Sequence, residues 1–294
     1  GTGMTVGWTR GNGDYVMVVA KQGSAPDDPT DLTVYDADAA FGSGDTTAAG
    51  SYVVYKGTGT SVPVTSLSAE TEYHFAVYEF NSSTIPAYRS SGEPRASQYT
   101  LYAEPTVQAT TVAFSTVGTS SMGVSWANGN GSGRLVIARA GNAPSTGPVD
   151  ATVYTANADF SAGGSSLGLG KVVYSGSGNS FTLTGLNPET QYYLQVYEYR
   201  GSGLSANYFT DTASGNPGNQ YTLSTEPSAH ASSFTAVAAS SSSINLSWNA
   251  AAGAFGYMIL QRTGANPTGT PTDGQAYSVS DVIGDATVAA IVTP

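Results

Sequence analysis

The feature that most constrains this chain is a long internal repeat, marked by its three tryptophans. Trp8, Trp126 and Trp248 are separated by 118 and 122 residues, and each ends a short alternating run, MTVGW, MGVSW or INLSW. After each tryptophan, a turn of small and polar residues leads into a second apolar run. Self-similarity at a fixed period predicts that one structural unit is built several times.

The repeats also match beyond the tryptophans. The stretch SYVVYKGTGTSVPVTSLSAETEYHFAVYEF aligns with GKVVYSGSGNSFTLTGLNPETQYYLQVYEY, and the linkers 97–110 and 219–232 each carry a Glu-Pro pair that stiffens a short hinge. We therefore divide the chain into repeat 1 (1–102), repeat 2 (103–224) and repeat 3 (225–294). Repeat 1 lacks the strand that precedes Trp126, and repeat 3 lacks the last strands. We expect a slice of a longer polypeptide, with an artificially designed chain as the alternative.

The secondary structure expected from the sequence is almost entirely strand. The apolar runs are short, they alternate, they are rich in Val, Tyr, Thr and Phe, and Gly, Ser, Asn and Pro separate them. No long segment has the 3.6-residue period of an amphipathic helix. Short strands at this spacing predict an all-β fold of sandwiches or barrels.

Two features together resemble the fibronectin type III domain. One is the tryptophan that closes the second strand. The other is a Leu-x-x-x-Thr-x-Tyr pattern that looks like the tyrosine corner of that family, in which a tyrosine hydroxyl bonds to nearby backbone; it occurs at Leu67, Thr71 and Tyr73, and again at Leu186, Thr190 and Tyr192. The resemblance implies tandem β-sandwiches, two near-complete and one partial, with structural roles for the tryptophans, Tyr73 and Tyr192.

The repeats depart from this family in length. The extra residues fall between the third strand and the VVY motif, at 22–51 and 140–170. The residue pattern of this region resembles a long-loop variant of the fibronectin type III domain that is frequent in large secreted proteins of the Bacteroidetes.

Composition excludes several classes of function. Charged residues make up only 11% of the chain, and 21 acidic against 10 basic residues give a net charge of −11. That sign argues against binding to nucleic acid or to anionic lipid. Without cysteine the chain has no disulfides, thiolate metal sites or cysteine nucleophiles. Abundant Tyr, Gly, Ser and Thr with few charges is typical of a secreted bacterial β-protein.

Two glutamates occupy matching positions, Glu79 in VYEF and Glu198 in VYEY. Counting from the corner tyrosine, Glu79 shares the inward face of its strand with Tyr73, Phe75 and Val77. An unpaired carboxylate there would be costly, so we expect each glutamate to accept hydrogen bonds from the backbone of the nearby Gly-Asn-Gly turn. A pair of glycosidase carboxylates is the alternative, but the two glutamates belong to different repeats.

An acidic loop in repeat 1 holds Asp27, Asp28 and Asp31. Oxygen-rich loops can bind calcium, so these three residues form a candidate calcium site, and no other cofactor is expected. The simpler alternative is that the aspartate of the thrice-repeated Asp-x-x-x-Tyr motif caps a turn.

Loop tyrosines and the two histidines complete the candidates. Tyr88 and Tyr208 fall in matching loops, where they could contact a glycan or protein ligand or instead close the end of their own core. Tyr78 and Tyr197 are predicted to point outward on the sheet. His74 and His230 have no partner at metal-ligand or triad spacing, so we interpret both as surface residues.

No catalytic constellation follows from these residues, and we expect no enzyme activity. The preferred hypothesis is a spacer or adhesion region of a large secreted or cell-surface bacterial protein. Its partners would be cell-surface proteins or glycans and neighbouring domains of the same chain. One alternative is the accessory region of a secreted hydrolase, and another is a docking or filament subunit completed by a partner chain.

Overall fold

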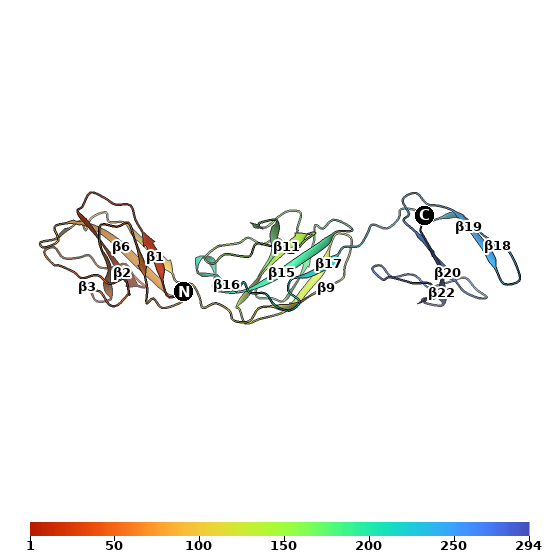
Figure 1. Ribbon diagram of the computed structural model, residues 1–294, viewed down its shortest axis with the longest axis horizontal. Coiled ribbons are helices and arrows are strands. Elements are labelled where there is room, and N and C mark those ends of the chain that lie inside the picture. Colours follow the sequence, from red (N-terminus) through yellow and green to blue (C-terminus); the bar gives the residue numbers. More distant parts are fainter. Residues whose placement is uncertain (294) are drawn as a thin grey trace.

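The computed structural model describes residues 1–293, and nearly all of its regular structure is strand. Figure 1 shows three groups of strands in a row along the chain. They fall within the three predicted repeats, although the exact boundaries of the repeats stay a prediction. Residues 1–293 contain no helix of the length and apolar character that crossing a membrane requires.

Repeat 2 forms two antiparallel sheets. The first has the order β14-β10-β9, and the second has the order β12-β13-β11-β15-β16, with β17 also paired to β15. The elements are β9 (Thr110–Ser115), β10 (Met122–Ala127), β11 (Gly133–Ala140), β12 (Ser166–Leu167), β13 (Gly170–Gly176), β14 (Ser180–Leu183), β15 (Gln191–Arg200), the short 3-10 helix η1 (Gly203–Ser205), β16 (Asn207–Tyr208) and β17 (Gly218–Tyr221).

Repeat 1 forms the same arrangement without a counterpart of β9. One sheet has the order β1-β5, and the other has the order β3-β4-β2-β6-β7, with β8 also paired to β6. The strands are β1 (Met4–Gly7), β2 (Tyr15–Gln22), β3 (Thr46–Ala48), β4 (Ser51–Gly57), β5 (Ser61–Val64), β6 (Glu72–Asn81), β7 (Ala87–Tyr88) and β8 (Arg95–Tyr99).

These strand orders are those of fibronectin type III-like sandwiches, which confirms the predicted fold class. The tyrosine corner is present in both repeats. The hydroxyl of Tyr73 accepts a hydrogen bond from the Ser68 N–H (3.0 Å), and that of Tyr192 accepts one from the Asn187 N–H (2.9 Å).

The expected core lies between the two sheets of each repeat. Alternate residues of β6, namely Tyr73, Phe75 and Val77, point into it, as the period of two requires. Trp126 is buried in the equivalent core of repeat 2, whereas Trp8 is only partly buried at the margin of its own. Each tryptophan packs on a tyrosine of the facing sheet, Trp8 on Tyr55 of β4 and Trp126 on Tyr174 of β13.

A second core lies on the outer face of the larger sheet in both repeats. The long loop after β2 or β11 folds across this face and buries Met17, Val19 and Tyr78 in repeat 1 and Ile137 and Tyr197 in repeat 2. Tyr78 and Tyr197 point outward from the sheet, as predicted, but they are buried and do not form an exposed contact on the sheet face. The long loop covers that face with apolar side chains of its own.

The described part of repeat 3, residues 225–293, has five strands in two separate sheets, β18-β19 and β20-β22-β21. They are β18 (Ser232–Ala238), β19 (Ile244–Asn249), β20 (Tyr257–Gln261), β21 (Val282–Ile283) and β22 (Ala286–Val292). Every residue of β18 is exposed, and so is Phe255 (90%). Trp248 packs on Tyr257 with ring centroids 5.5 Å apart. The available strands thus leave much of the apolar surface of this repeat uncovered.

Repeats 1 and 2 meet at a hydrogen-bonded junction. The N–H of Tyr102 donates to Ser205 O (3.2 Å), the Asn207 amide donates to Tyr102 O (2.8 Å), and the Gln98 amide donates to Leu204 O (3.2 Å). The linker is therefore held by the loop around η1, at the end of repeat 2 that faces repeat 1 (Figure 1).

Candidate functional site

The repeated Gly-Asn-Gly turn lies against the glutamate at the end of the longest strand. In repeat 1, Gly11 N–H donates to Oε1 of Glu79 (2.6 Å), and Gly13 N–H donates to Oε2 (3.2 Å). In repeat 2, Gly129 N–H donates to Oε1 of Glu198 (2.7 Å), and Gly131 N–H donates to Oε2 (2.8 Å). The hydrogen bonds expected from the sequence are therefore present in both repeats.

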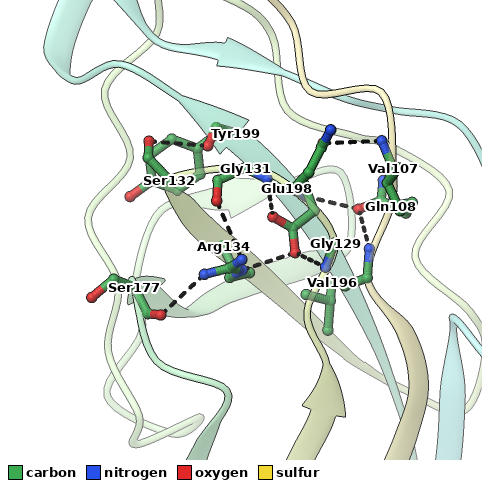
Figure 2. A network of polar contacts seen from close by, with 12 residues as sticks. Val107, Gln108, Gly129, Gly131, Ser132, Arg134, Ser177, Val196, Glu198 and Tyr199 are labelled. Carbon is green, nitrogen blue, oxygen red and sulfur yellow. Dashed lines mark hydrogen bonds and ion pairs between the residues drawn. The ribbon is translucent and has the colours of Figure 1, made fainter.

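An arginine that the sequence analysis missed completes this unit. Its Nε donates to Oε1 of the glutamate, from Arg10 in repeat 1 (3.1 Å) and from Arg134 in repeat 2 (2.8 Å). The rest of each guanidinium donates to two backbone carbonyls. The acceptors are Thr58 and Gly13 for Arg10, and Ser177 and Gly131 for Arg134. Figure 2 shows the unit in repeat 2.

The two arginines reach this place from different positions in the sequence. Arg10 lies in the turn, directly before Gly11, where repeat 2 has Asn128. Arg134 lies on β11 directly opposite Glu198, where repeat 1 has Val16 opposite Glu79 on β2. The four carbonyl acceptors nevertheless occupy matching places in the two repeats. Because an alignment of the repeats does not pair the arginines, no repeated pattern in the sequence points to them.

The electrostatics of the unit favour an ionised carboxylate. Burial opposes ionisation of Glu79, but the hydrogen bonds from Arg10 and from the Gly11 N–H outweigh it and hold its pKa below the ordinary value. The hydrogen bond to Glu79 raises the pKa of Arg10. The Glu198 side chain is fully buried, and that of Arg134 is 7% exposed. Burial denies Glu198 the access to a reactant that proton transfer needs. The lowered pKa of Glu79 makes it a weaker base than an ordinary glutamate.

In repeat 2, the linker residues ahead of β9 also bind the glutamate and the Gly-Asn-Gly turn. The side-chain oxygen of Gln108 accepts from the Glu198 N–H (2.8 Å), and the Gln108 amide donates to Phe209 O (2.7 Å). The side chain of Asn130, the middle residue of the turn, accepts from the N–H groups of Thr106 (3.0 Å) and Val107 (3.1 Å). The turn therefore holds the incoming chain as well as the glutamate, which sequence reasoning also missed.

The predicted calcium residues do not come together in the structure. Asp27 pairs with Lys21 (2.7 Å), Asp28 pairs with Arg95 (2.8 Å), and Asp31 accepts from the Tyr88 N–H (2.8 Å). Within residues 1–293, no group of three or more His, Asp or Glu side chains is placed to hold a metal ion. The lysine and the arginine, which the sequence analysis did not consider, give two of these carboxylates a cation from the protein itself.

In repeats 1 and 2, the aspartate of the Asp-x-x-x-Tyr motif makes a tertiary contact rather than capping a local turn. Asp31 binds the N–H of Tyr88 across the sheet end, and Asp150 binds that of Tyr208 in the same way (2.7 Å). The motif tyrosines pack edge-on against the same two residues, with centroids 5.9 Å apart for Tyr35–Tyr88 and 5.7 Å apart for Tyr154–Tyr208. The motif thus fastens the long loop to the short strand β7 or β16.

Tyr88 and Tyr208 consequently lie inside the second core rather than on the surface. They are 8% and 6% exposed, and burial raises the pKa of each to about 12. Their hydroxyls donate to Thr33 O and Thr152 O of the long loops. The structure therefore places them where they close the core, and a ligand contact through their rings is not available.

The histidines lie apart from this chemistry. His74 leaves β6 on the side opposite Tyr73 and Phe75, with its Nε2 3.5 Å from a Glu72 carboxylate oxygen. His230 is exposed in the segment before β18. Neither approaches Glu79 or Glu198 among the contacts of residues 1–293.

Comparisons with known proteins establish neither a family nor a function for this chain. No family model and no curated protein matches the sequence. Among solved structures, the FN1–FN3 domains of chicken CNTN1 are 17% identical, with 76% of this chain and 62% of that chain covered and a TM-score of 0.34. The central fibronectin III array of RIM-binding protein is 13% identical, with 84% and 74% covered and a TM-score of 0.24. The fold assignment rests on the strand order and the tyrosine corners.

Proposed function

We propose that this chain is a non-catalytic spacer that holds other modules at a fixed distance, as part of a secreted or cell-surface bacterial protein. The observation that carries the proposal is the junction between repeats 1 and 2. Three hydrogen bonds join the linker residues Gln98 and Tyr102 to the η1 loop of repeat 2. A linker held in this way transmits the orientation of one module to the next.

The construction of each repeat supports the same function. A second core under the long loop buries both faces of the larger sheet, which stiffens the module. The chemically distinctive groups, namely the two glutamates, their arginines and the loop aspartates, all bind other parts of the protein. These observations favour a mechanical function over a chemical one.

Composition supports an extracellular setting and a neutral partner. Few charges and many hydroxyl-bearing residues suit contact with proteins or glycans at a cell surface, and with neighbouring domains of the same polypeptide. The net charge of −11 disfavours phosphate-rich partners.

The spacer proposal is tested by measuring the distance between the two repeats. The chain has no cysteine, so the substitutions Ala49→Cys and Thr182→Cys introduce its only two thiols. Spin labels attached to these thiols report one distance, from repeat 1 to repeat 2. Pulsed electron resonance on the full chain should give one narrow distance distribution. Asn207→Ala removes a junction hydrogen bond and should broaden it, whereas Asn187→Ala, an exposed position at the other end of repeat 2, should not. A broad distribution in the unmodified background would overturn the proposal.

A further inference from the structure

Every Asn-Gly pair of this chain lies in or directly beside one of the two Gly-Asn-Gly turns. The pairs are Asn12-Gly13, Asn128-Gly129 and Asn130-Gly131. Asparagine is a thermolabile residue, and a following glycine makes it more reactive, because glycine has no side chain to hinder ring closure. The chain therefore gathers its chemically most labile asparagines around Glu79 and Glu198.

The reaction to which an Asn-Gly pair is prone is deamidation. The backbone nitrogen of the glycine attacks the side-chain carbon Cγ of the asparagine. A bond forms between these two atoms, the bond from Cγ to the amide nitrogen breaks, and the amide nitrogen leaves as ammonia with the proton that the glycine nitrogen loses. Water then opens the resulting succinimide ring to aspartate or isoaspartate. The reaction thus needs a glycine N–H that can lose its proton and a side chain that can reach it.

All three glycine N–H groups are held by a carboxylate. Gly13 donates to Oε2 of Glu79 (3.2 Å), Gly129 donates to Oε1 of Glu198 (2.7 Å), and Gly131 donates to Oε2 of Glu198 (2.8 Å). Such a charge-assisted hydrogen bond is strong, and it must break before the nitrogen can attack. Loss of the proton would also leave a negative nitrogen directly beside a negative oxygen.

The fold requires glycine after each of these asparagines. A Cβ built on Gly13 would lie 2.8 Å from Oε2 of Glu79, and one built on Gly131 would lie 2.5 Å from Oε2 of Glu198. A Cβ built on Gly129 would collide with the carbonyl oxygen of Val107. A larger residue, which would slow the reaction, therefore does not fit at these positions.

The two pairs of repeat 2 differ in how the asparagine side chain is held. The side-chain oxygen of Asn130 accepts from the N–H groups of Thr106 and Val107, and its amide nitrogen donates to Oγ1 of Thr106 (2.9 Å). The Asn128 side chain is exposed and has no hydrogen-bond partner within residues 1–293. Both reacting groups are therefore restrained at Asn130, but only the glycine N–H is restrained at Asn128.

We propose that Glu79 and Glu198 protect the three Asn-Gly pairs from deamidation by holding the glycine N–H groups. The damage that they prevent would disrupt the turns themselves. Isoaspartate carries the main chain through the side-chain carbon, which lengthens the turn, and either product adds a negative charge beside the glutamate. This inference does not depend on the proposed spacer function, because it concerns only the chemistry of the turns.

The first measurement follows deamidation of the full chain in warm, mildly alkaline buffer by peptide mapping and mass spectrometry. Free peptides with the sequences of residues 8–16 and 124–134 give the rates without the glutamates. We expect each asparagine to react at least about tenfold more slowly in the folded chain than in its peptide. Asn130 should react more slowly than Asn128.

Glu79→Gln separates the effect of the carboxylate from that of the fold. Glutamine offers one acceptor oxygen to the guanidinium and two N–H groups, so deamidation at Asn12 should accelerate about tenfold. Asn128 and Asn130 of the same molecule should keep their rates. The matched control Tyr73→Phe also destabilises repeat 1 but leaves Glu79 in place, so it should not change the rate at Asn12.

Three results would overturn the proposal. The first is an unchanged rate at Asn12 in Glu79→Gln. The second is an equal acceleration in Tyr73→Phe, because unfolding of repeat 1, and not the carboxylate, would then control the rate. The third is deamidation of the unmodified chain as fast as that of the peptides. This last result needs no substitution, so it decides the question even where Glu79→Gln fails to fold.

Discussion

In repeats 1 and 2, an arginine guanidinium pairs with the glutamate at the matching position, but the arginine comes from a different position in each repeat. Arg10 approaches from the turn and Arg134 from the central strand, yet each donates to the carboxylate and to two matching backbone carbonyls. The comparison teaches that the fold requires a cation at this place in the three-dimensional structure, and that the position of the arginine in the sequence can vary. A carboxylate at the inward end of a strand explains the requirement, since it must be paired.

The same comparison shows how an additional strand changes the environment of the pair. Side-chain exposure is 22% for Arg10 and 16% for Glu79, but 7% for Arg134 and 0% for Glu198. Part of the difference comes from Gln108 and Ala109, which cover the pair only in repeat 2. The Arg10–Glu79 ion pair of repeat 1 is therefore partly exposed to water, whereas the Arg134–Glu198 ion pair of repeat 2 is buried.

The largest expected effect is the loss of the buried carboxylate. Glu198→Gln leaves Arg134 buried beside a neutral group and should lower the free energy of unfolding of repeat 2 by about 3–5 kcal/mol. Glu79→Gln should cost repeat 1 only about 1–2 kcal/mol, because water reaches the pair. Denaturant-dependent hydrogen exchange, read separately in each repeat, measures both values. Equal losses would mean that burial does not distinguish the two pairs.

The second effect concerns the fastening of the long loops. Asp31→Ala and Asp150→Ala each remove the acceptor for a tyrosine N–H and should cost about 1–2 kcal/mol, since the lost hydrogen bond is charge-assisted. Exchange should accelerate in residues 28–36 or 147–156 and in the facing strand, β7 or β16. If exchange changes only next to the substituted residue, the aspartate is a local turn cap, as the sequence alone suggested.

A smaller and equal effect is expected at the two tyrosine corners. Tyr73→Phe and Tyr192→Phe remove one neutral hydrogen bond each and should lower the stability of each repeat by about 1 kcal/mol. Thermal unfolding of the single variants measures the effect. The corners lie at the end of the sandwich away from the ion pairs, so a large difference between the repeats would show that the ion pair is not the main source of their asymmetry.

The fold and part of the candidate site could be predicted from the sequence. The tryptophan spacing and the tyrosine corners identified the sandwiches, because both patterns are local and occur twice. The period of two along β6 placed Glu79 inward beside Phe75 and Val77, and the neighbouring turn supplied its donors. These inferences needed only strand geometry and the cost of an unpaired charge.

Contacts between residues far apart in the sequence could not be predicted from local sequence patterns. The outward direction of Tyr78 and Tyr197 was predicted, but their burial was not, because nothing in the sequence shows that a long loop folds back over a sheet. The arginines escaped notice because they do not align. Asp27 and Asp28 were interpreted as calcium ligands because their partners Lys21 and Arg95 were not considered. In each case the missing information was a side-chain partner brought close by the tertiary fold.

The smallest effect is the pH dependence of the contribution that Glu79 makes to the stability of repeat 1. Because the pKa of Glu79 is lower in the folded state than in the unfolded chain, its ionisation stabilises repeat 1 above the unfolded pKa of about 4.3. This contribution is lost as the pH falls through the lower, folded pKa. The difference in melting temperature between the unmodified chain and Glu79→Gln should therefore shrink on acidification below pH 4. A constant difference would show that the charge of Glu79 is not involved.

Moving the arginine within repeat 1 tests the central claim most directly. Arg10→Asn alone should destabilise repeat 1, and Val16→Arg alone should bring two guanidinium groups to one carboxylate and also destabilise it. The double variant recreates the arrangement of repeat 2 and should recover much of the loss, so that the effects of the two substitutions are not additive. Additive losses in this double-mutant cycle would contradict the account, because the position of the arginine in the sequence, and not its place in the fold, would then be what matters.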